Sequence, residues 1–569
     1  HTVLATKALT VTKQMGDKYI TIGPDFSQDA ANPEFMEDAS LFAALREALY
    51  AKGVRVRIGR WKVEGSPIAI LIDFKSLISQ KDEVLKHLWE DYHVDSLAGQ
   101  WDYVEPVLFG HAAGIVVKSY VENFCKSVDN IVAHFHEWMA AAGSLYLHDN
   151  APYVATVFST HATVMGRCIA GNRLPLYNDL HKFNADELAR QFNVMAKHSL
   201  EKAGATYADA FLTVSDITAN ECRYLLGREV TRITPNGFEN GFVPAEAKLA
   251  ELRAASRRKL IDVARATWGY DFAEDTLIVA SSGRYEFHNK GLDVFLESLK
   301  QLATSNINRD VLAVIAVPAG NTGAREDLAQ HLANGSAIDP AQKRYLTHHL
   351  EAEAWDQVSQ SIEGSILSTS ASRVKVLFVP TYLNGNDGIF NMPYYDMLAG
   401  VDLTIFASYY EPWGYTPLES VAYGVPTVTT TLAGFGMWVA KQAEHKGVDI
   451  VRRDDYNTRE VVLQITDILK HYMDMNAEEY AEARKGAMEI SNTALWKRLF
   501  KEYKQAYEEA IDNSVSRTNR VLIDGGDRSE QINFVRQQLT SNRPSWHRLM
   551  VEKGIPARLK ALEELSRNL

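Results

Sequence analysis

The sequence has few cysteines, no long apolar run and no long run of one charge. Its three cysteines, Cys125, Cys168 and Cys222, lie far apart without the spacing of metal ligands, which favours a reducing compartment. The best apolar run, residues 67–74, is much shorter than the roughly 18 to 20 residues that cross a membrane. The sequence shows no signal-peptide pattern. We therefore expect a cytoplasmic protein that has no membrane partner.

The charge balance is acidic. The 60 Lys and Arg and the 72 Asp and Glu give a formal net charge of −12, which argues against nucleic acid as a partner. An anionic substrate must therefore be held by Arg and Lys side chains placed close to it. With 569 residues, of which 46% are hydrophobic and 23% charged, the chain is too long for one ordinary domain. We expect two domains with large cores.

Short apolar runs alternate with helical patterns along most of the chain, after a helix that is expected at the N-terminus. This alternation predicts α/β domains with parallel sheets, whose ligands lie at the carboxyl ends of the strands. In the first half we expect strands at residues 19–23, 54–58, 68–74, 130–135, 153–158, 211–214 and 230–234. In the second half we expect them at residues 276–281, 311–317, 374–379 and 401–407.

The stretch YYEPWGYTPLESVAYGVPTVTTTLAGFG, residues 409–436, carries two carboxylates eight positions apart, Glu411 and Glu419. It follows the buried strand expected at 401–407. A strand, a glycine turn and a helix start can together form an anion pocket, because unpaired backbone N–H groups point into it. From the spacing alone, ordinary helix punctuation is the more frequent explanation.

A short helix is predicted inside this stretch. Thr416 should be its N-cap, Pro417 suits the first helical position, and Glu419 lies three residues after Thr416, the spacing of a capping box. The helix should stop at Gly424. This gives Glu419 a structural role that competes with ligand binding.

Polar residues also follow an expected strand in AHFHEWMA, which contains His134, His136 and Glu137. A zinc hydrolase would need HExxH, but Ala140 stands where the second histidine should be, so we reject that class. A pair of this kind is more often structural and hydrogen-bonded than a substrate contact. Both interpretations of His136 stay open.

Further candidates lie in loops between strands and helices. FSTHATVMGRCIAG carries His161 and Arg167, and GRYEFHNKG carries Arg284 and Lys290 after the strand expected at 276–281. Surface cations usually do no more than interact with water, yet two in such a loop lie where a pyrophosphate would bind. Without further information Tyr394 is most simply a core aromatic. Asn236, in TPNG, and its neighbour Gly237 are by themselves a turn signal.

Five motifs, in this order, resemble the retaining glycogen synthases of glycosyltransferase family 3. They are THATVMGR, TPNG, GRYEFHNKG, a tyrosine seventeen residues before Glu411, and EPWGYTPLE followed by GVPTVTTTLAGFG. The resemblance runs from about Thr2 to Gly436. It implies the GT-B fold, in which two Rossmann-like domains face each other across a cleft and a C-terminal helix packs back on the first domain. The expected domains are residues 1–240, 241–500 and 501–569.

The same resemblance implies a role for each candidate. Glu411 would lie near the developing oxocarbenium ion, in a role that the sequence leaves open, and His161 would contact the donor sugar. Arg284, Lys290 and Arg167 would bind the diphosphate.

The nucleoside would have its own contacts. Tyr394 would stack on uracil, and Glu419 would bind the ribose. Further substrate contacts are expected from His136, Asn236, Trp413, Gly414, Tyr415 and Thr416.

The implied reaction moves glucose from UDP-glucose to the non-reducing end of glycogen or another α-1,4-glucan, with retention of configuration. We expect no metal ion and no cofactor. Alternatives are the same reaction with ADP-glucose or another donor, a different cleft enzyme such as a nucleotide-sugar epimerase or a glucan phosphorylase, and a catalytically silent glycan-binding protein. A phosphorylase would need a lysine that carries pyridoxal phosphate.

Three further expectations concern departures from the family and its assembly. Relatives carry a first strand and a Lys-Val-Gly-Gly loop before the N-terminal helix; this loop is absent from the sequence, which we therefore expect to lack part of its active site. Relatives that respond to glucose 6-phosphate have an arginine-rich helix. Here Arg484 and Lys485 precede GAME, so we expect a short form without strong activation. A polar helical insertion is expected at 324–367, where relatives contact one another, so we expect a homo-oligomer.

Overall fold

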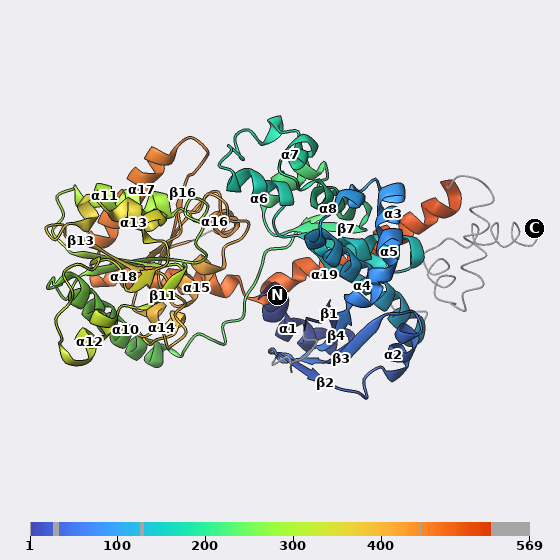
Figure 1. Ribbon diagram of the computed structural model, residues 1–569, viewed down its shortest axis with the longest axis horizontal. Coiled ribbons are helices and arrows are strands. Elements are labelled where there is room, and N and C mark those ends of the chain that lie inside the picture. Colours follow the sequence, from blue (N-terminus) through green and yellow to red (C-terminus); the bar gives the residue numbers. More distant parts are fainter. Residues whose placement is uncertain (1, 27–33, 126–129, 443–444, 525–569) are drawn as a thin grey trace, which may run out of the picture.

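The computed structural model describes residues 2–26, 34–125, 130–442 and 445–524, with side chains as far as residue 517. Figure 1 shows two lobes, with the blue to teal segments in one and the yellow to orange segments in the other. No helix within those ranges is long and apolar enough to cross a membrane. The exact domain boundaries stay a prediction.

The first lobe contains a mixed sheet with the strand order β1-β4-β3-β2. Its strands are β1 (Ile20–Pro24), β2 (Phe35–Glu37), β3 (Arg55–Trp61) and β4 (Ile68–Asp73). The expected strands are confirmed, but the expected parallel arrangement is wrong here, because β3 is antiparallel to both β4 and β2. The physical reason is the connection: residues 62–67 can form a hairpin, whereas a parallel pair needs a crossover of about a dozen residues or more.

The second sheet of this lobe is parallel throughout and has the order β5-β6-β7-β8. Its strands are β5 (Val132–His136), β6 (Ala155–Thr160), β7 (Ala210–Thr213) and β8 (Arg232–Ile233). These strands confirm the expected ones at 130–135, 153–158, 211–214 and 230–234, with small shifts at their ends.

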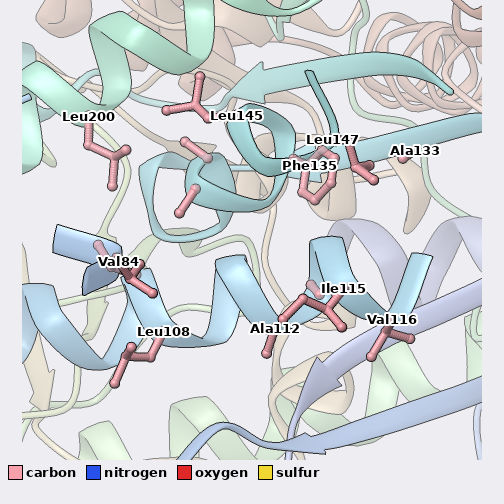
Figure 2. Packing of buried hydrophobic residues seen from close by; sticks show 14 of the residues in the cluster. Val84, Leu108, Ala112, Ile115, Val116, Ala133, Phe135, Leu145, Leu147 and Leu200 are labelled. Carbon is pink, nitrogen blue, oxygen red and sulfur yellow. The ribbon is translucent and has the colours of Figure 1, made fainter. Parts of the chain in front are cut away.

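Helices cover both sheets. They are α1 (Thr2–Met15), α2 (Ala43–Tyr50), α3 (Lys81–Tyr92), α4 (Trp101–Phe124), α5 (Ala141–Asn150), α6 (Val164–Gly171), α7 (Ala185–Gln191), α8 (Met195–Tyr207) and α9 (Asp216–Glu221). In Figure 2, Ala112 and Ile115 of α4 lie opposite Leu145 of α5 and Phe135 of β5 in the shared core. This apolar packing fixes the strand ends that carry His136 and His161.

The second lobe has one six-stranded parallel sheet of order β13-β10-β9-β14-β15-β16. Its strands are β9 (Leu277–Ser282), β10 (Val311–Ala316), β13 (Val374–Val379), β14 (Leu403–Ile405), β15 (Thr427–Thr430) and β16 (Val448–Val451). The surrounding helices are α10 (Glu246–Trp268), α11 (Leu292–Ala303), α14 (Tyr394–Ala399), α15 (Tyr415–Ala422), α16 (Gly434–Ala440), α17 (Thr458–Asp474) and α18 (Ala477–Thr493). Every residue of β9, β10 and β13 is buried, as expected for a parallel sheet with both faces covered.

The expected polar helical insertion at 324–367 is only partly helical. It contains α12 (Glu326–Asn334) and α13 (Gln357–Ile362), but β11 (Asn321–Ala324) and β12 (His348–Leu350), which precede and follow α12, form an antiparallel ribbon. The cause is a buried cation: Arg325 is 1% exposed and donates to the carbonyls of Lys343 and Leu346 at 2.8 and 2.9 Å. These bonds fold the polar segment back on itself, which helical periodicity does not reveal.

The chain returns to the first lobe through α19 (Trp496–Asp524), as Figure 1 shows. Ala506 and Ala510 of this helix are fully buried against Val157 and Leu212 on the parallel sheet. The expected C-terminal helix that packs back on the first domain is therefore confirmed. The rest of the domain expected at 501–569, from residue 525 on, lies outside the described residues.

Candidate active site

Loops of the two lobes contact each other beside the candidate residues. In the second lobe, β14 leads into the loop with Glu411, and β9 leads into the loop with Lys290. The first lobe meets them: the backbone N–H of Leu176 donates to the Tyr409 hydroxyl at 3.0 Å, and that hydroxyl donates to the Leu174 carbonyl at 3.2 Å. The two lobes therefore contact each other two residues before Glu411.

Lys290 and Glu411 form an ion pair. The Lys290 Nζ donates to Oε2 of Glu411, and the two side chains are 14% and 15% exposed. A glycine makes this contact possible, because a Cβ on Gly291 would overlap the carbonyl oxygen of Ala407, just after β14. Gly291 also has φ +71°, a conformation that favours glycine. The sequence predicted both charged residues, and the structure brings them into contact.

The two arginines are more open to solvent. Arg284 is 67% exposed and its guanidinium lies 3.0 Å from a carboxylate oxygen of Glu286. Arg167, on α6, is also exposed. Within the described residues neither arginine forms an ion pair with Glu411, so the structure does not bring all the predicted phosphate-binding cations together. Arg284 would have to leave Glu286 to reach a diphosphate.

The predicted helix after Glu411 begins two residues earlier than expected. Gly414 is the N-cap of α15, with φ +116°, and Tyr415 is already helical, so the assignment of Thr416 as N-cap is wrong. The capping box is wrong too, because the Glu419 carboxylate instead accepts from the Tyr395 hydroxyl at 3.0 Å. The physical reason is Gly414, whose positive φ turns the chain before Thr416 is reached. The predicted stop holds, because α15 ends just before Gly424.

Glu419 lies in a cluster of tyrosines. Burial raises the pKa of its carboxyl to about 7, and the hydrogen bond from Tyr395 offsets part of that rise. The Tyr395 ring stacks on Tyr423 at a centroid distance of 5.6 Å. Tyr394 shares a hydrogen bond of 2.7 Å with Ser282, the last residue of β9. Both candidates for the nucleoside thus lie near the carboxyl edge of the second-lobe sheet.

Three histidines form a column at the carboxyl edge of the first-lobe sheet. His134 stacks on His136 at 4.0 Å, and the His136 Nδ1 lies 3.1 Å from the His161 Nε2. His134 also bonds Ser159 and Tyr507, at 2.7 and 3.1 Å, which supports a structural role for this residue. Burial lowers the pKa of all three, that of His161 to about 4, so the column is neutral near pH 7.

Trp413, Tyr415 and Asn236 meet where the chain crosses between the lobes. The Tyr415 hydroxyl donates to the carbonyl of Gly237 at 3.4 Å. Trp413 and Asn236 are each 4% exposed, and within the described residues the Trp413 Nε1 and the Asn236 Oδ1 have no hydrogen-bond partner. A cavity of about 430 Å³ borders Trp413, Trp438 and Arg498, but neither Glu411 nor Lys290 lines it.

Comparison with known proteins decides the family. The family model described as Glycogen synthase matches residues 1–331 and 340–565. The chain belongs to the glycogen synthase family. A "Glycogen [starch] synthase" of Neurospora crassa is 29% identical over 90% of this chain and 81% of its own length. The liver "Glycogen [starch] synthase" of Mus musculus is 29% identical over 89% of this chain and 80% of its own. The resemblance seen in the sequence is thus confirmed, and the chain is a glycosyltransferase.

Among solved structures, the catalytic domain of starch synthase IV from Arabidopsis thaliana, bound to ADP and acarbose, aligns with a TM-score of 0.46 and 13% identity. The alignment covers 87% of this chain and 99% of that chain. The GT-B fold of this glycogen synthase family member rests on its two α/β lobes and on the return of α19.

Sequence reasoning missed two buried carboxyls behind the His161 loop, Glu201 and Glu221, and gave no role to Glu137. Burial raises the pKa of Glu137 and Glu221 to about 7 and that of Glu201 to about 8. Glu201 accepts from the Thr160 hydroxyl at 2.5 Å and from the Val164 N–H at 2.9 Å. The glycogen synthase motifs do not include these acids. Glu201 lies on α8 and Glu221 ends α9, and each helix also carries charged residues that are not buried, so no local pattern marks these two acids.

Proposed function

We propose that the protein transfers glucose from UDP-glucose to the 4-hydroxyl at the non-reducing end of an α-1,4-glucan such as glycogen, with retention of configuration. The observation that carries the proposal is the ion pair of Lys290 and Glu411, in a member of the glycogen synthase family, at the contact between the lobes. A cation and a carboxylate so placed suit a reaction that develops charge of both signs.

The chemistry would rest on preorganised electrostatics. Breaking the anomeric bond leaves negative charge on the β-phosphate, which Lys290, Arg284 and Arg167 would stabilise. An ammonium group has three donors, so Lys290 can keep its bond to Glu411 and also donate to a phosphate oxygen. The N–H groups at the start of α15, after Gly414, would add partial positive charge. The Glu411 carboxylate would face the oxocarbenium ion.

The nucleoside and the sugar would occupy the edges of the same site. Tyr394 would stack on the base, and Glu419 would accept from the ribose hydroxyls, which is supported by its buried carboxyl. His161 would contact the sugar, as a neutral group at pH 7. His136 would act through His161, to which it is hydrogen-bonded.

The remaining parts of the proposal concern the location of the protein, its self-association and the need for a metal or cofactor. We propose a cytoplasmic location, supported by three free cysteines that stand far apart in the sequence. We propose self-association through the polar segment 324–367, and catalysis with no metal or cofactor. Activity that survives exhaustive chelation, and loss of self-association after substitutions in that segment, are the expected results.

The decisive experiment measures nucleotide release from UDP-glucose, ADP-glucose and GDP-glucose with glycogen present, for the protein and its Glu411→Ala variant. UDP release together with glucan elongation, lost in the variant, supports the proposal. Release from ADP-glucose alone would overturn the donor. Absence of glycogen-dependent release from all three donors would overturn the transferase proposal for this chain.

A further inference from the structure

Glu221, the last residue of α9, joins two loops that come from different lobes. Its side chain is fully buried. The Oε2 atom accepts from the Thr163 hydroxyl at 2.7 Å and from the Tyr410 hydroxyl at 3.3 Å. Thr163 and Tyr410 lie 58 and 189 residues from Glu221 in the sequence. One carboxylate oxygen thus holds a first-lobe segment and a second-lobe segment at one point.

Both segments carry candidate site residues. Thr163 is the N-cap of α6, where its hydroxyl oxygen accepts from the Gly166 N–H at 2.9 Å, and it stands between His161 and Arg167. Tyr410 is 5% exposed and directly precedes Glu411. A shift of the Glu221 carboxyl would therefore move groups on both sides of the reacting sugar.

The packing around this carboxyl leaves little freedom. A Cβ on Gly166 would overlap Oε2 of Glu221, so α6 lies directly against the carboxyl. The other oxygen, Oε1, has no hydrogen-bond partner among the described residues. A buried acceptor left unpaired is costly, and a structure keeps one where the other contacts of the group outweigh that cost.

We propose that Glu221 is a positioning residue for the transfer reaction: its carboxyl sets the Glu411 loop of the second lobe against the His161–Arg167 segment of the first lobe in the closed cleft. This inference rests on the proposed function, because it assumes that Glu411 acts at the sugar. It assigns Tyr410 the role of transmitting the position of Glu221 to Glu411.

The charge state of Glu221 offers a second readout. Burial raises its pKa to about 7, and the hydroxyls of Thr163 and Tyr410 and the charge of Arg167 offset part of the rise. The other titratable groups that interact with it electrostatically are Glu201, Tyr177 and Cys222. An ionised carboxylate accepts hydrogen bonds more strongly than a neutral acid does. Closure should thus strengthen as pH rises through about 7.

The test is a double-mutant cycle of Glu221→Ala and Tyr410→Phe, measured as kcat and KM with UDP-glucose and glycogen. Each single variant should lower kcat about tenfold or more, with KM for the donor changed less than about threefold, because the contact acts in the closed state. The kcat of the double variant should lie within about threefold of the kcat of the more impaired single variant. The reason is that both substitutions remove the same contact between Tyr410 and Glu221. Multiplicative losses in kcat would overturn the inference.

Two further variants separate positioning from simple damage to the fold. In Glu221→Gln the amide oxygen can still accept hydrogen bonds from the hydroxyls of Thr163 and Tyr410. The kcat at pH 7 should therefore be within about threefold of that of the original protein. The change of kcat with pH near pH 7 should disappear, because the amide does not ionise. Tyr472→Phe is the matched control, because that buried tyrosine also donates to a carboxylate, Asp449 at 3.1 Å, but within the second lobe. Its kcat should not change. A Glu221→Gln variant as impaired as Glu221→Ala would contradict the inference.

Hydrogen exchange of residues 406–416 tests the same contact without activity. Exchange should be faster in Glu221→Ala and in Tyr410→Phe than in Tyr472→Phe. If the unchanged protein does not use UDP-glucose, the proposed function fails while this measurement still decides the contact. If it does use UDP-glucose, and neither kcat nor exchange responds to the two variants, the inference alone fails.

Discussion

Two opposite charges that are largely removed from water define the site at the scale of residues. Leaving either member of such a pair alone is costly, because the remaining charge is desolvated without compensation. The Lys290–Glu411 pair is also the point where a donor phosphate and a developing cation would meet in the proposed reaction. Its two members should therefore affect the chemical step more than binding.

Lys290→Ala should lower kcat with UDP-glucose by about 100-fold or more, because it removes a preorganised cation from the leaving phosphate. Steady-state kinetics with glycogen as acceptor checks this. Lys300→Ala is the control, since Lys300 pairs with Glu297 at 3.3 Å on the surface of α11 and should leave kcat unchanged. A loss of less than about threefold in Lys290→Ala would rule out the electrostatic role.

Glu419→Gln should raise the KM for the nucleotide sugar about tenfold and leave the melting temperature within about 2 °C, because among the described residues the carboxylate caps no helix and accepts one hydrogen bond, from Tyr395. Tyr395→Phe separates the internal hydrogen bond from the proposed ribose contact, since it removes the hydroxyl that donates to Glu419 but leaves the carboxylate in place. A large drop in melting temperature with unchanged KM would assign Glu419 to stability instead.

Whether a site residue could be predicted from the sequence depended on whether a motif marks it and on how far away in the sequence its partners lie. Glu411 and Lys290 could be predicted because family motifs mark them, and their contact spans 121 residues. The carboxyls of Glu201 and Glu221 could not, because their partners lie 37 to 189 residues away and carry no local pattern. The Thr416 cap failed since spacing identifies a capping box but not the φ of the preceding Gly414.

At the scale of elements, periodicity placed the strands but not their direction. The strands expected at 54–58 and 68–74 exist, yet they form an antiparallel pair, because alternation of apolar runs says nothing about orientation. The six residues between β3 and β4 do carry that information. The polar segment 324–367 was harder still, because the buried Arg325 that organises it resembles a surface residue in the sequence.

Helix α8 carries a pH-dependent contribution to stability. Burial raises the pKa of Glu201 from 4.5 to about 8, so folding favours the protonated form. The stabilisation is fully present below pH 4.5 and is lost as pH rises through about 8. In Glu201→Gln the amide oxygen can accept from the Val164 N–H, the amide NH2 can donate to the Thr160 hydroxyl oxygen, and the side chain cannot ionise. The variant should therefore be more stable than the original protein at pH 9, by up to about 5 kcal/mol.

Thermal melting at pH 6 and pH 9 checks this prediction. Between pH 6 and pH 9 the melting temperature of the original protein should fall more than that of Glu201→Gln. Glu187→Gln, on the exposed start of α7, provides the control, because its side chain is not part of the buried group of acids. If the melting temperatures of all three proteins changed equally between pH 6 and pH 9, ionisation of Glu201 would not lower the stability of the fold, and the prediction would be wrong.

At the scale of the whole molecule, the chain passes between the lobes twice, near Phe238 and near Trp496, and these two connections contact each other. The backbone N–H of Trp496 donates to the carbonyl of Phe238 at 3.1 Å, at the point where α18 gives way to α19. A Cβ on Gly237 would lie 2.7 Å from the fully buried Trp496 ring. TPNG is thus more than a turn signal, because its glycine lets the two crossings pack against each other.

Gly237→Ala should lower the stability by about 1 to 3 kcal/mol, the usual cost of overpacking a rigid contact. Chemical denaturation measures this change. Gly241→Ala in the same crossing is the control, because the nearest atom to its Cβ, the Glu64 Oε1, lies at an ordinary 3.7 Å. If both variants were equally stable, the crossing would be looser than the contact indicates.

Regulation by glucose 6-phosphate would require free cations on α18, and the described contacts already engage both basic residues there. Arg484 Nε donates to the Gly424 carbonyl at 2.9 Å, and Lys485 lies 3.9 Å from Glu489. A phosphate dianion would have to displace these contacts with few charges to compensate. Millimolar glucose 6-phosphate should therefore raise transfer from UDP-glucose by less than about twofold, with glucose and inorganic phosphate as controls. A severalfold rise that Arg484→Ala abolishes would establish an allosteric site on α18 instead.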